Sequence, residues 1–138
     1  MADGSPDVVW RAMAAVVFDN RDAWRRGVIE TTGLPFSRVR VLRRLARRQM
    51  TAKEIAEAAT MDAPATSVAI NDLESRGLVV RQAHPTNRRC KVVSLTDEGR
   101  QMIASIDGVD DPAPQAFAAL SPAELKALES ILAKLTTG

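Results

Sequence analysis

The chain has 138 residues, 46% of them apolar, and no tyrosine, which fits one domain whose core depends on aliphatic residues and favours helices. A single cysteine excludes an intramolecular disulfide and favours a reducing compartment. No apolar run approaches the roughly 20 residues that span a bilayer. The start MADGSPDVVW also lacks the pattern of a signal peptide, so we expect a cytoplasmic protein without membrane contact.

The net charge of +2 hides a strong segregation of charge along the chain. Ten basic and two acidic residues give +8 at 21–53, residues 54–75 give −5, and residues 76–91 give +5 without any acidic residue. Charge alone leaves two interpretations open: solvated helix faces, or a surface that follows the phosphates of a nucleic acid.

The first half of the chain predicts four helices. Ser5-Pro6 marks the start of a long amphipathic stretch that ends at TTGLPF (31–36), and a second helix starts at Pro35. The segment TAKE (51–54) is a capping box that opens a short third helix. A fourth helix spans 62–76, with Asp62 as its cap and Thr66, Ala69, Ile70 and Leu73 on its inward side.

The second half predicts a hairpin followed by two helices. Residues 78–83 and 90–95 are rich in β-branched side chains and flank a basic bend, HPTNRR. Thr96 caps a further helix that ends at Gly108, where GVDDPAPQ breaks the helical pattern. A second capping box at Ser121–Glu124 opens the last helix.

This order of elements predicts a mainly α fold with a small β-hairpin, namely a winged helix-turn-helix. A helix about 10–12 Å wide fits the major groove of DNA. In such a fold the preceding helix braces the recognition helix, and the tip of the hairpin, called the wing, reaches a neighbouring groove or phosphate. Here the recognition helix would be 62–76, and the wing would span 78–95.

Three segments of the chain resemble the MarR (multiple antibiotic resistance regulator) family of bacterial transcription factors. These are GLPFSRVRVLRRLA, the stretch from MTAKEIAEAA to LESRGLVVR, and NRRCKVVSLTDEG, and the final LSPAELKALESIL adds to the likeness. The resemblance implies a single MarR-like domain over residues 1–138, with a winged core at 35–107. It further implies N- and C-terminal dimerisation helices, mainly 1–33 and 108–138, and a homodimer that binds a near-palindromic operator in double-stranded DNA. The break at GVDDPAPQ departs from the long continuous helix of the family.

Candidate DNA contacts lie on the recognition helix, on the wing and at the start of the supporting helix. An asparagine can pair bidentately with adenine, and Val or Ala can contact a thymine methyl group. A helix N-terminus suits a phosphate, and arginine suits a minor groove. Relatives often carry Arg at the position of Val68 and an acid at that of Asn87, so an ion pair within the wing is lost here. The candidates are Ala65, Ser67, Val68 and Asn71 on the helix, Thr51 and Lys53 before it, and His84, Asn87, Arg88, Arg89 and Lys91 on the wing.

Alternative interpretations remain for each set: the helix face is only solvated, or the wing arginines only keep an edge hairpin soluble. A lone histidine without a second ligand at suitable spacing does not indicate a metal site, and we expect no cofactor. Cys90 lies between two basic residues, which is weak support for redox sensing because neighbours in a strand point to opposite faces.

The resemblance also implies a pocket for a small aromatic or phenolic ligand between the dimerisation helices and the winged core. Its candidate lining is Met13, Val16, Asn20, Phe36 and Met102, although apolar side chains at helical spacing more often belong to a core. We therefore expect a dimeric, DNA-binding transcriptional repressor that such a ligand releases. The alternative is a winged-helix protein–protein interaction module without specific DNA binding. An enzyme is not expected, because no nucleophile–base pair or phosphate-binding glycine loop is present.

Overall fold

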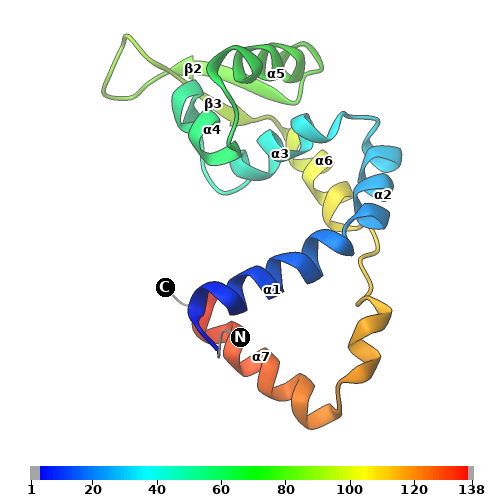
Figure 1. The fold of residues 1–138 in the computed structure, drawn as a ribbon. Helices are drawn as coiled ribbons and strands as arrows, with labels where there is room; N and C mark the ends of the chain where they lie inside the picture. Colours follow the sequence, from blue (N-terminus) through cyan, green and yellow to red (C-terminus); the bar gives the residue numbers. More distant parts are fainter. Residues whose placement is uncertain (1–3, 137–138) are drawn as a thin grey trace.

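The computed structural model describes residues 4–136, which form seven α-helices, one 3-10 helix and a three-stranded antiparallel sheet (Figure 1). The predicted fold class, a mainly α winged helix-turn-helix, is confirmed. The elements in chain order are α1 (Pro6–Asp19), α2 (Asp22–Thr32), α3 (Phe36–Leu45), β1 (Met50–Thr51), α4 (Ala52–Ala59), α5 (Ala63–Ser75), β2 (Val79–Ala83), β3 (Lys91–Leu95), α6 (Asp97–Asp107), η1 (Gln115–Ala119) and α7 (Pro122–Thr136).

The first predicted helix is divided into two, which corrects the expectation of one long stretch. Helix α1 ends at Asn20, which has φ −120° and ψ 14°, and its side-chain amide donates to the carbonyl oxygen of Val16 at 2.7 Å. An asparagine that bonds to the preceding turn competes with continuation of the helix. Asp22 then begins α2, and its carboxylate suits the positive end of the new helix.

The caps predicted from sequence set the ends of the helix-turn-helix. The hydroxyl of Thr51 accepts from the backbone N–H of Glu54 at 3.2 Å, and the carboxylate of Glu54 accepts from the N–H of Thr51 at 3.0 Å. Asp62 caps α5 by accepting from the N–H of Ala65 at 2.7 Å. After α5, Gly77 adopts φ 76°, a left-handed conformation that glycine adopts without steric cost. The supporting helix and the recognition helix are therefore placed by side chains that the sequence identifies.

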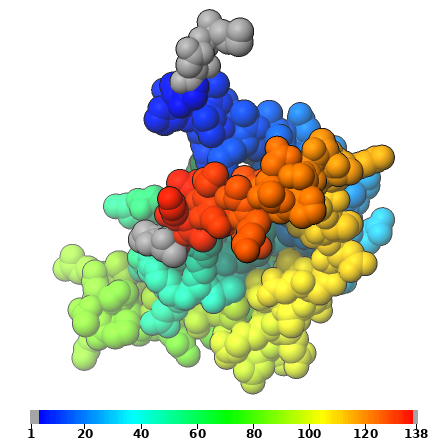
Figure 2. All heavy atoms as spheres, turned by 90° about the horizontal axis from the view of Figure 1, so that it is seen from below, coloured from blue at the N-terminus to red at the C-terminus, as the bar shows by residue number. Residues whose placement is uncertain are grey.

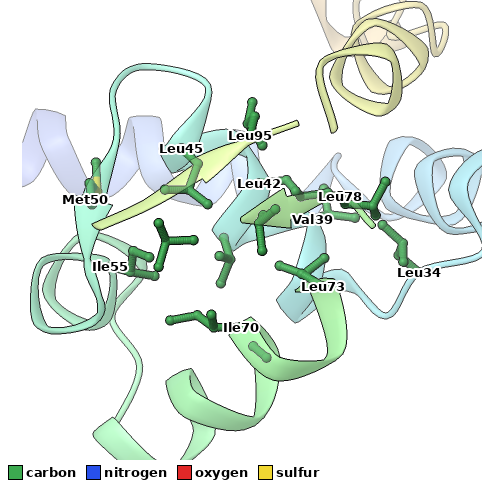
Figure 3. Close-up of a cluster of buried hydrophobic side chains, with 14 of the residues drawn as sticks. Leu34, Val39, Leu42, Leu45, Met50, Ile55, Ile70, Leu73, Leu78 and Leu95 are labelled. Atoms are coloured by element: carbon green, nitrogen blue, oxygen red, sulfur yellow. The ribbon is translucent and has the colours of Figure 1, made fainter. Parts of the chain in front are cut away.

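The hairpin gains a third strand that was not predicted. Strand β1 pairs with β3 through Met50 opposite Val93 and Thr51 opposite Val92, so β3 lies between β1 and β2. Two residues are too few to display the alternation that marks a strand in a sequence. The buried side chains of this sheet and of α3, α4 and α5 form one apolar core (Figure 3).

Helices α1 and α7 extend away from this core (Figure 1) and contribute no buried residue. Seen from below, α7 lies in front of the core (Figure 2). The predicted break after α6 is confirmed, because the chain leaves the helix at Gly108 and forms only the short η1 before α7. Among the described residues, nine of the twelve exposed large apolar side chains lie on α1 and α7. They are Val9, Trp10, Val16, Val17 and Phe18 on α1, and Leu125, Ile131, Leu132 and Leu135 on α7. None of the helices within 4–136 is long and apolar enough to cross a membrane.

Candidate nucleic-acid interface

The four residues predicted to read bases lie together on the outer face of α5. Its inner face is buried against the core and carries the four residues predicted there. On the outer face Val68 is 58% exposed, and Ala65, Ser67 and Asn71 are also exposed. The side chains of this face are small, partly apolar and include no basic residue. Strong attraction to phosphate must therefore come from neighbouring elements.

Two arginines that were not among the predicted DNA contacts flank the C-terminal half of α5. The Nε atom of Arg38 on α3 lies 3.0 Å from Oδ2 of Asp72, and Nε of Arg76 lies 3.2 Å from Oδ1 of the same residue. The hydrogen bond from Arg38, followed by that from Arg76, holds the pKa of Asp72 below its usual value. This cluster ties the recognition helix to α3 and places positive charge beside its outer face.

A third arginine reaches the same helix from the sheet. Arg81 on β2 donates from Nη1 to Glu74 at 2.7 Å and from Nη2 to the side-chain oxygen of Asn71 at 2.8 Å. A usable signal was present in the sequence, because Arg81 is two residues after the buried Val79 and therefore shares its face of the strand. That face is turned toward α5.

The wing is ordered by its own polar side chains. The Nδ1 atom of His84 accepts from the backbone N–H groups of Thr86 and Asn87, both at 3.1 Å. The side-chain oxygen of Asn87 accepts from the N–H of Arg89 at 3.1 Å, so this asparagine caps the turn by hydrogen bonding. Arg88 and Arg89 are exposed at the tip, and the structure gives Arg88 no ion pair among the described residues.

The start of α4 borders a hollow of about 300 Å³ between α4 and α5. Lys53 and Ser67 both line it, so one predicted phosphate contact and one predicted base contact lie on the same concave surface. Thr51 is already engaged in its capping box, and the pKa of Glu54 is lowered, chiefly by the backbone N–H of Thr51 and then by Arg48. The side chain of Lys53 has no hydrogen bond or ion pair among the described residues, and the hydroxyl of Thr51, which accepts in the capping box, can still donate its O–H.

A larger open groove, of about 820 Å³, lies between the winged core and the end of α1. Phe36 lines it, with the guanidinium carbon of Arg25 4.3 Å from its ring centroid, and Asp107 is the acidic residue of the lining. The other predicted pocket residues, Met13, Val16, Asn20 and Met102, do not line this groove. Its basic lining consists of Arg25, Arg40, Arg43, Arg44 and Arg47.

Cys90, at the base of the wing, accepts a weak hydrogen bond from the side-chain nitrogen of Asn87 at 3.5 Å. It is half-buried, and its neighbour Lys91 is exposed. Within residues 4–136, no group of three or more His, Cys, Asp or Glu side chains is arranged to hold a metal ion.

Comparisons with known proteins match part of the sequence and nearly all of the fold. The model of the MarR family matches residues 32–89. Over 81 residues, the chain is 37% identical to a protein of Thauera aromatica described as a transcriptional regulatory protein for the hcr operon. That match covers 56% of this chain and 49% of the relative, so the chain spans about half the length of that protein.

Solved structures of similar fold extend over nearly the whole chain. A MarR family transcriptional regulator from Streptomyces coelicolor, crystallised in complex with DNA, is 25% identical with a TM-score of 0.62, covering 98% of this chain and 91% of that one. A protein from Mycobacterium tuberculosis has a TM-score of 0.75 at 21% identity, covering 98% and 94%. MarR itself from E. coli, in its apo form, has a TM-score of 0.67 at 19% identity, covering 90% and 96%.

Proposed function

We propose that the chain is a transcriptional regulator of the MarR family, namely a homodimeric repressor that binds a near-palindromic operator and is released by a small aromatic anion. The observation that carries the DNA-binding part is the outer face of α5, where Ala65, Ser67, Val68 and Asn71 are exposed together beside Arg38, Arg76 and Arg81. Such a regulator acts where the chromosome lies, so the cytoplasm is its proposed location.

Each part of this surface has a distinct proposed role. The face of α5 would enter the major groove, and Arg88 at the wing tip would enter a minor groove. Arg89, Lys91, Lys53 and Thr51 would contact phosphates, while His84 and Asn87 shape the turn that presents the wing arginines. Because α5 has no Lys or Arg before Arg76, a large share of the affinity would come from these flanking cations.

A salt titration with the purified protein tests DNA binding against the alternative of a protein-interaction module. Specific duplex binding should weaken steeply between 50 and 200 mM salt, because each neutralised phosphate releases counterions. The sequence to use comes from footprinting across genomic DNA, where a near-palindromic motif is the expected result. Absence of measurable duplex binding at low salt would contradict DNA binding and favour the interaction module.

The proposed dimer would cover the apolar faces of α1 and α7, within the segments 1–33 and 108–138. A monomer would leave side chains such as Trp10 (67% exposed) and Leu135 (66% exposed) in water. Exposed large apolar side chains gathered on two helices are typical of an interface. A two-fold dimer would present two α5 helices to half-sites about one turn of DNA apart.

The proposed ligand site is the arginine-lined groove. Five arginines against one aspartate favour an anion, and the half-buried ring of Phe36 favours a planar apolar group. Benzoate or salicylate should therefore raise the melting temperature of the protein and reduce operator binding, whereas benzamide, which has the same shape but no charge, should do neither. A ligand shifts the dimer only to the extent that it binds one of its shapes more tightly. Equal effects of benzoate and benzamide would contradict an anion site.

A further inference from the structure

His84, the only histidine of the chain, lies where the wing turns, and its ring accepts hydrogen bonds from the turn itself. Its Nδ1 atom lies 3.1 Å from the backbone nitrogens of both Thr86 and Asn87, and 3.3 Å from the hydroxyl oxygen of Thr86. The backbone N–H of His84 donates to the carbonyl oxygen of Cys90 at 3.1 Å. One residue thus ties the end of β2 both to the tip of the wing and to the residue before β3.

These contacts fix the protonation state of the imidazole. A backbone N–H is a donor only, so the ring nitrogen that faces Thr86 and Asn87 must accept and carries no proton. In a neutral imidazole the proton then lies on Nε2. Nε2 has no hydrogen-bond partner among the described residues, so its N–H remains available to an acceptor outside the chain, such as a phosphate oxygen.

The surroundings of His84 give no support to a positive charge on the ring. Helix α5 packs on β2, but the carboxylate of its Glu74 is bound to Arg81 at 2.7 Å. The thiol of Cys90 accepts from the side-chain nitrogen of Asn87 at 3.5 Å. Within residues 4–136 His84 has no ion pair, so no carboxylate there compensates for a proton on Nδ1. The charged side chains of the wing are all basic, namely Arg81, Arg88, Arg89 and Lys91.

We propose that His84 is a positioning residue that acts as a neutral imidazole: Nδ1 holds the wing in the shape that presents Arg88, and a proton on Nδ1 releases the wing from DNA. The inference rests on the proposed DNA-binding function. A proton on Nδ1 replaces the acceptor of two N–H groups by a further donor that faces them. It adds no donor at the other ring nitrogen, because Nε2 already carries a proton in the neutral form.

Protonation also has an opposite effect, because a positive ring attracts phosphate. That gain is one charge. The loss concerns the two exposed arginines at the tip, Arg88 and Arg89, which are presented to DNA together only while the turn is ordered. We therefore expect protonation of His84 to weaken operator binding.

Nitrogen-15 NMR of the wild type without DNA tests the first half of the proposal. Because the chain has a single histidine, both imidazole nitrogen signals belong to His84. At about pH 7.5 the proton should lie on Nε2 and not on Nδ1. As the pH falls to about 5.5, the amide signals of Thr86 and Asn87 should shift in step with the imidazole, because both N–H groups lose their acceptor.

Operator binding at constant ionic strength tests the second half. The wild type should bind about fivefold more weakly at about pH 5.5 than at about pH 7.5. His84→Asn is the matched control, because its side-chain oxygen can accept from the same N–H groups but does not titrate. Its affinity should therefore be equal at the two pH values within about twofold. His84→Phe keeps a flat ring without an acceptor and should bind weakly at both. All three proteins keep the α-amino group, which also titrates in this range.

The inference is overturned by a proton on Nδ1 at neutral pH, or by amide signals of Thr86 and Asn87 that do not follow the imidazole. Wild-type binding that is equal or tighter at the lower pH, the same decline in His84→Asn, or full affinity of His84→Phe at neutral pH would also overturn it. A wild type without specific duplex binding at either pH would remove the proposed function, and with it the effect of His84 on DNA. A wild type that binds its operator specifically and gives any of the contrary results would remove the inference alone.

Discussion

The guanidinium of Arg38, near the start of α3, lies 3.0 Å from the carboxylate of Asp72 in the second half of α5. The two residues are 34 positions apart, and their side chains are only 19% and 31% exposed. Arg76, four residues after Asp72, completes the cluster. The contact fixes the second half of the recognition helix α5 to the core helix α3. Asp72 directly follows Asn71, so the contact lies beside a predicted base-reading residue.

The Arg38–Asp72 contact should make stability depend on pH. Hydrogen bonds from Arg38 and Arg76 lower the pKa of Asp72 from 3.8, so the folded protein binds this proton less readily than the unfolded chain does. The stabilisation is therefore present above pH 4 and is lost as the pH falls through the lowered pKa. Urea denaturation between pH 2 and 6 should show a steeper acid loss of unfolding free energy for the wild type than for Asp72→Asn. If the unfolding free energies of the wild type and Asp72→Asn fall in parallel with pH, the Arg38–Asp72 pair contributes nothing to stability.

Gly99 should be intolerant of any side chain. A Cβ atom at Gly99 would clash with the carbonyl oxygen of Leu78, which already accepts from the N–H of Thr96. The obstacle is backbone, so Gly99→Ala should lower the free energy of unfolding by about 1–3 kcal/mol. Gly108→Ala is the matched control: there a Cβ would lie 3.4 Å from its nearest atom, at an ordinary helical φ of −81°. Denaturation curves that coincide for the two variants would contradict this account.

The recognition helix and its caps could be predicted because their determinants are local. The capping box at Thr51, the cap at Asp62 and the apolar spacing of α5 each lie within a few residues of what they control. The division of α1 from α2 could not be predicted from spacing alone. It depends on the backbone that Asn20 adopts in a helix with no buried side chain to keep it continuous.

The arginines around α5 show a different limit. Arg38 contacts Asp72 across 34 positions of the sequence, and Arg81 contacts Asn71 across 10. Which helix such an arginine contacts depends on how the chain folds, and the local sequence does not show it. Of the predicted pocket residues only Phe36 borders the groove, and its arginines lie in the basic segment 21–53, whose charge alone left solvated helix faces and a phosphate-following surface as open interpretations. The alternation of side chains along β2 could have placed Arg81 on the inward face of the strand, because it shares that face with the buried Val79.

Arg88→Ala should weaken DNA binding without unfolding the protein. Arg88 is exposed at the wing tip and supports no ion pair in the described chain, so its loss leaves the turn made by His84 and Asn87 intact. We expect operator affinity to fall about tenfold or more, with an unchanged denaturation midpoint. Arg100→Ala removes the same charge from an exposed site on α6 and serves as the control in fluorescence anisotropy. Equal affinities for the wild type and Arg88→Ala would leave the wing as a turn without a role in binding.

The uncovered faces of α1 and α7 should determine assembly. An unpaired carboxylate buried at an interface is strongly unfavourable, so Trp10→Glu and Leu135→Glu should each raise the dimer dissociation constant about a hundredfold or more. Neither helix contributes a buried residue to the core, so the far-ultraviolet dichroism of the winged core should persist. Gln101→Glu introduces the same charge at an exposed position of α6 and should leave the dimer intact in sedimentation equilibrium. If the wild type is monomeric at micromolar concentration, or if both glutamate variants dimerise as it does, another surface must cover these helices.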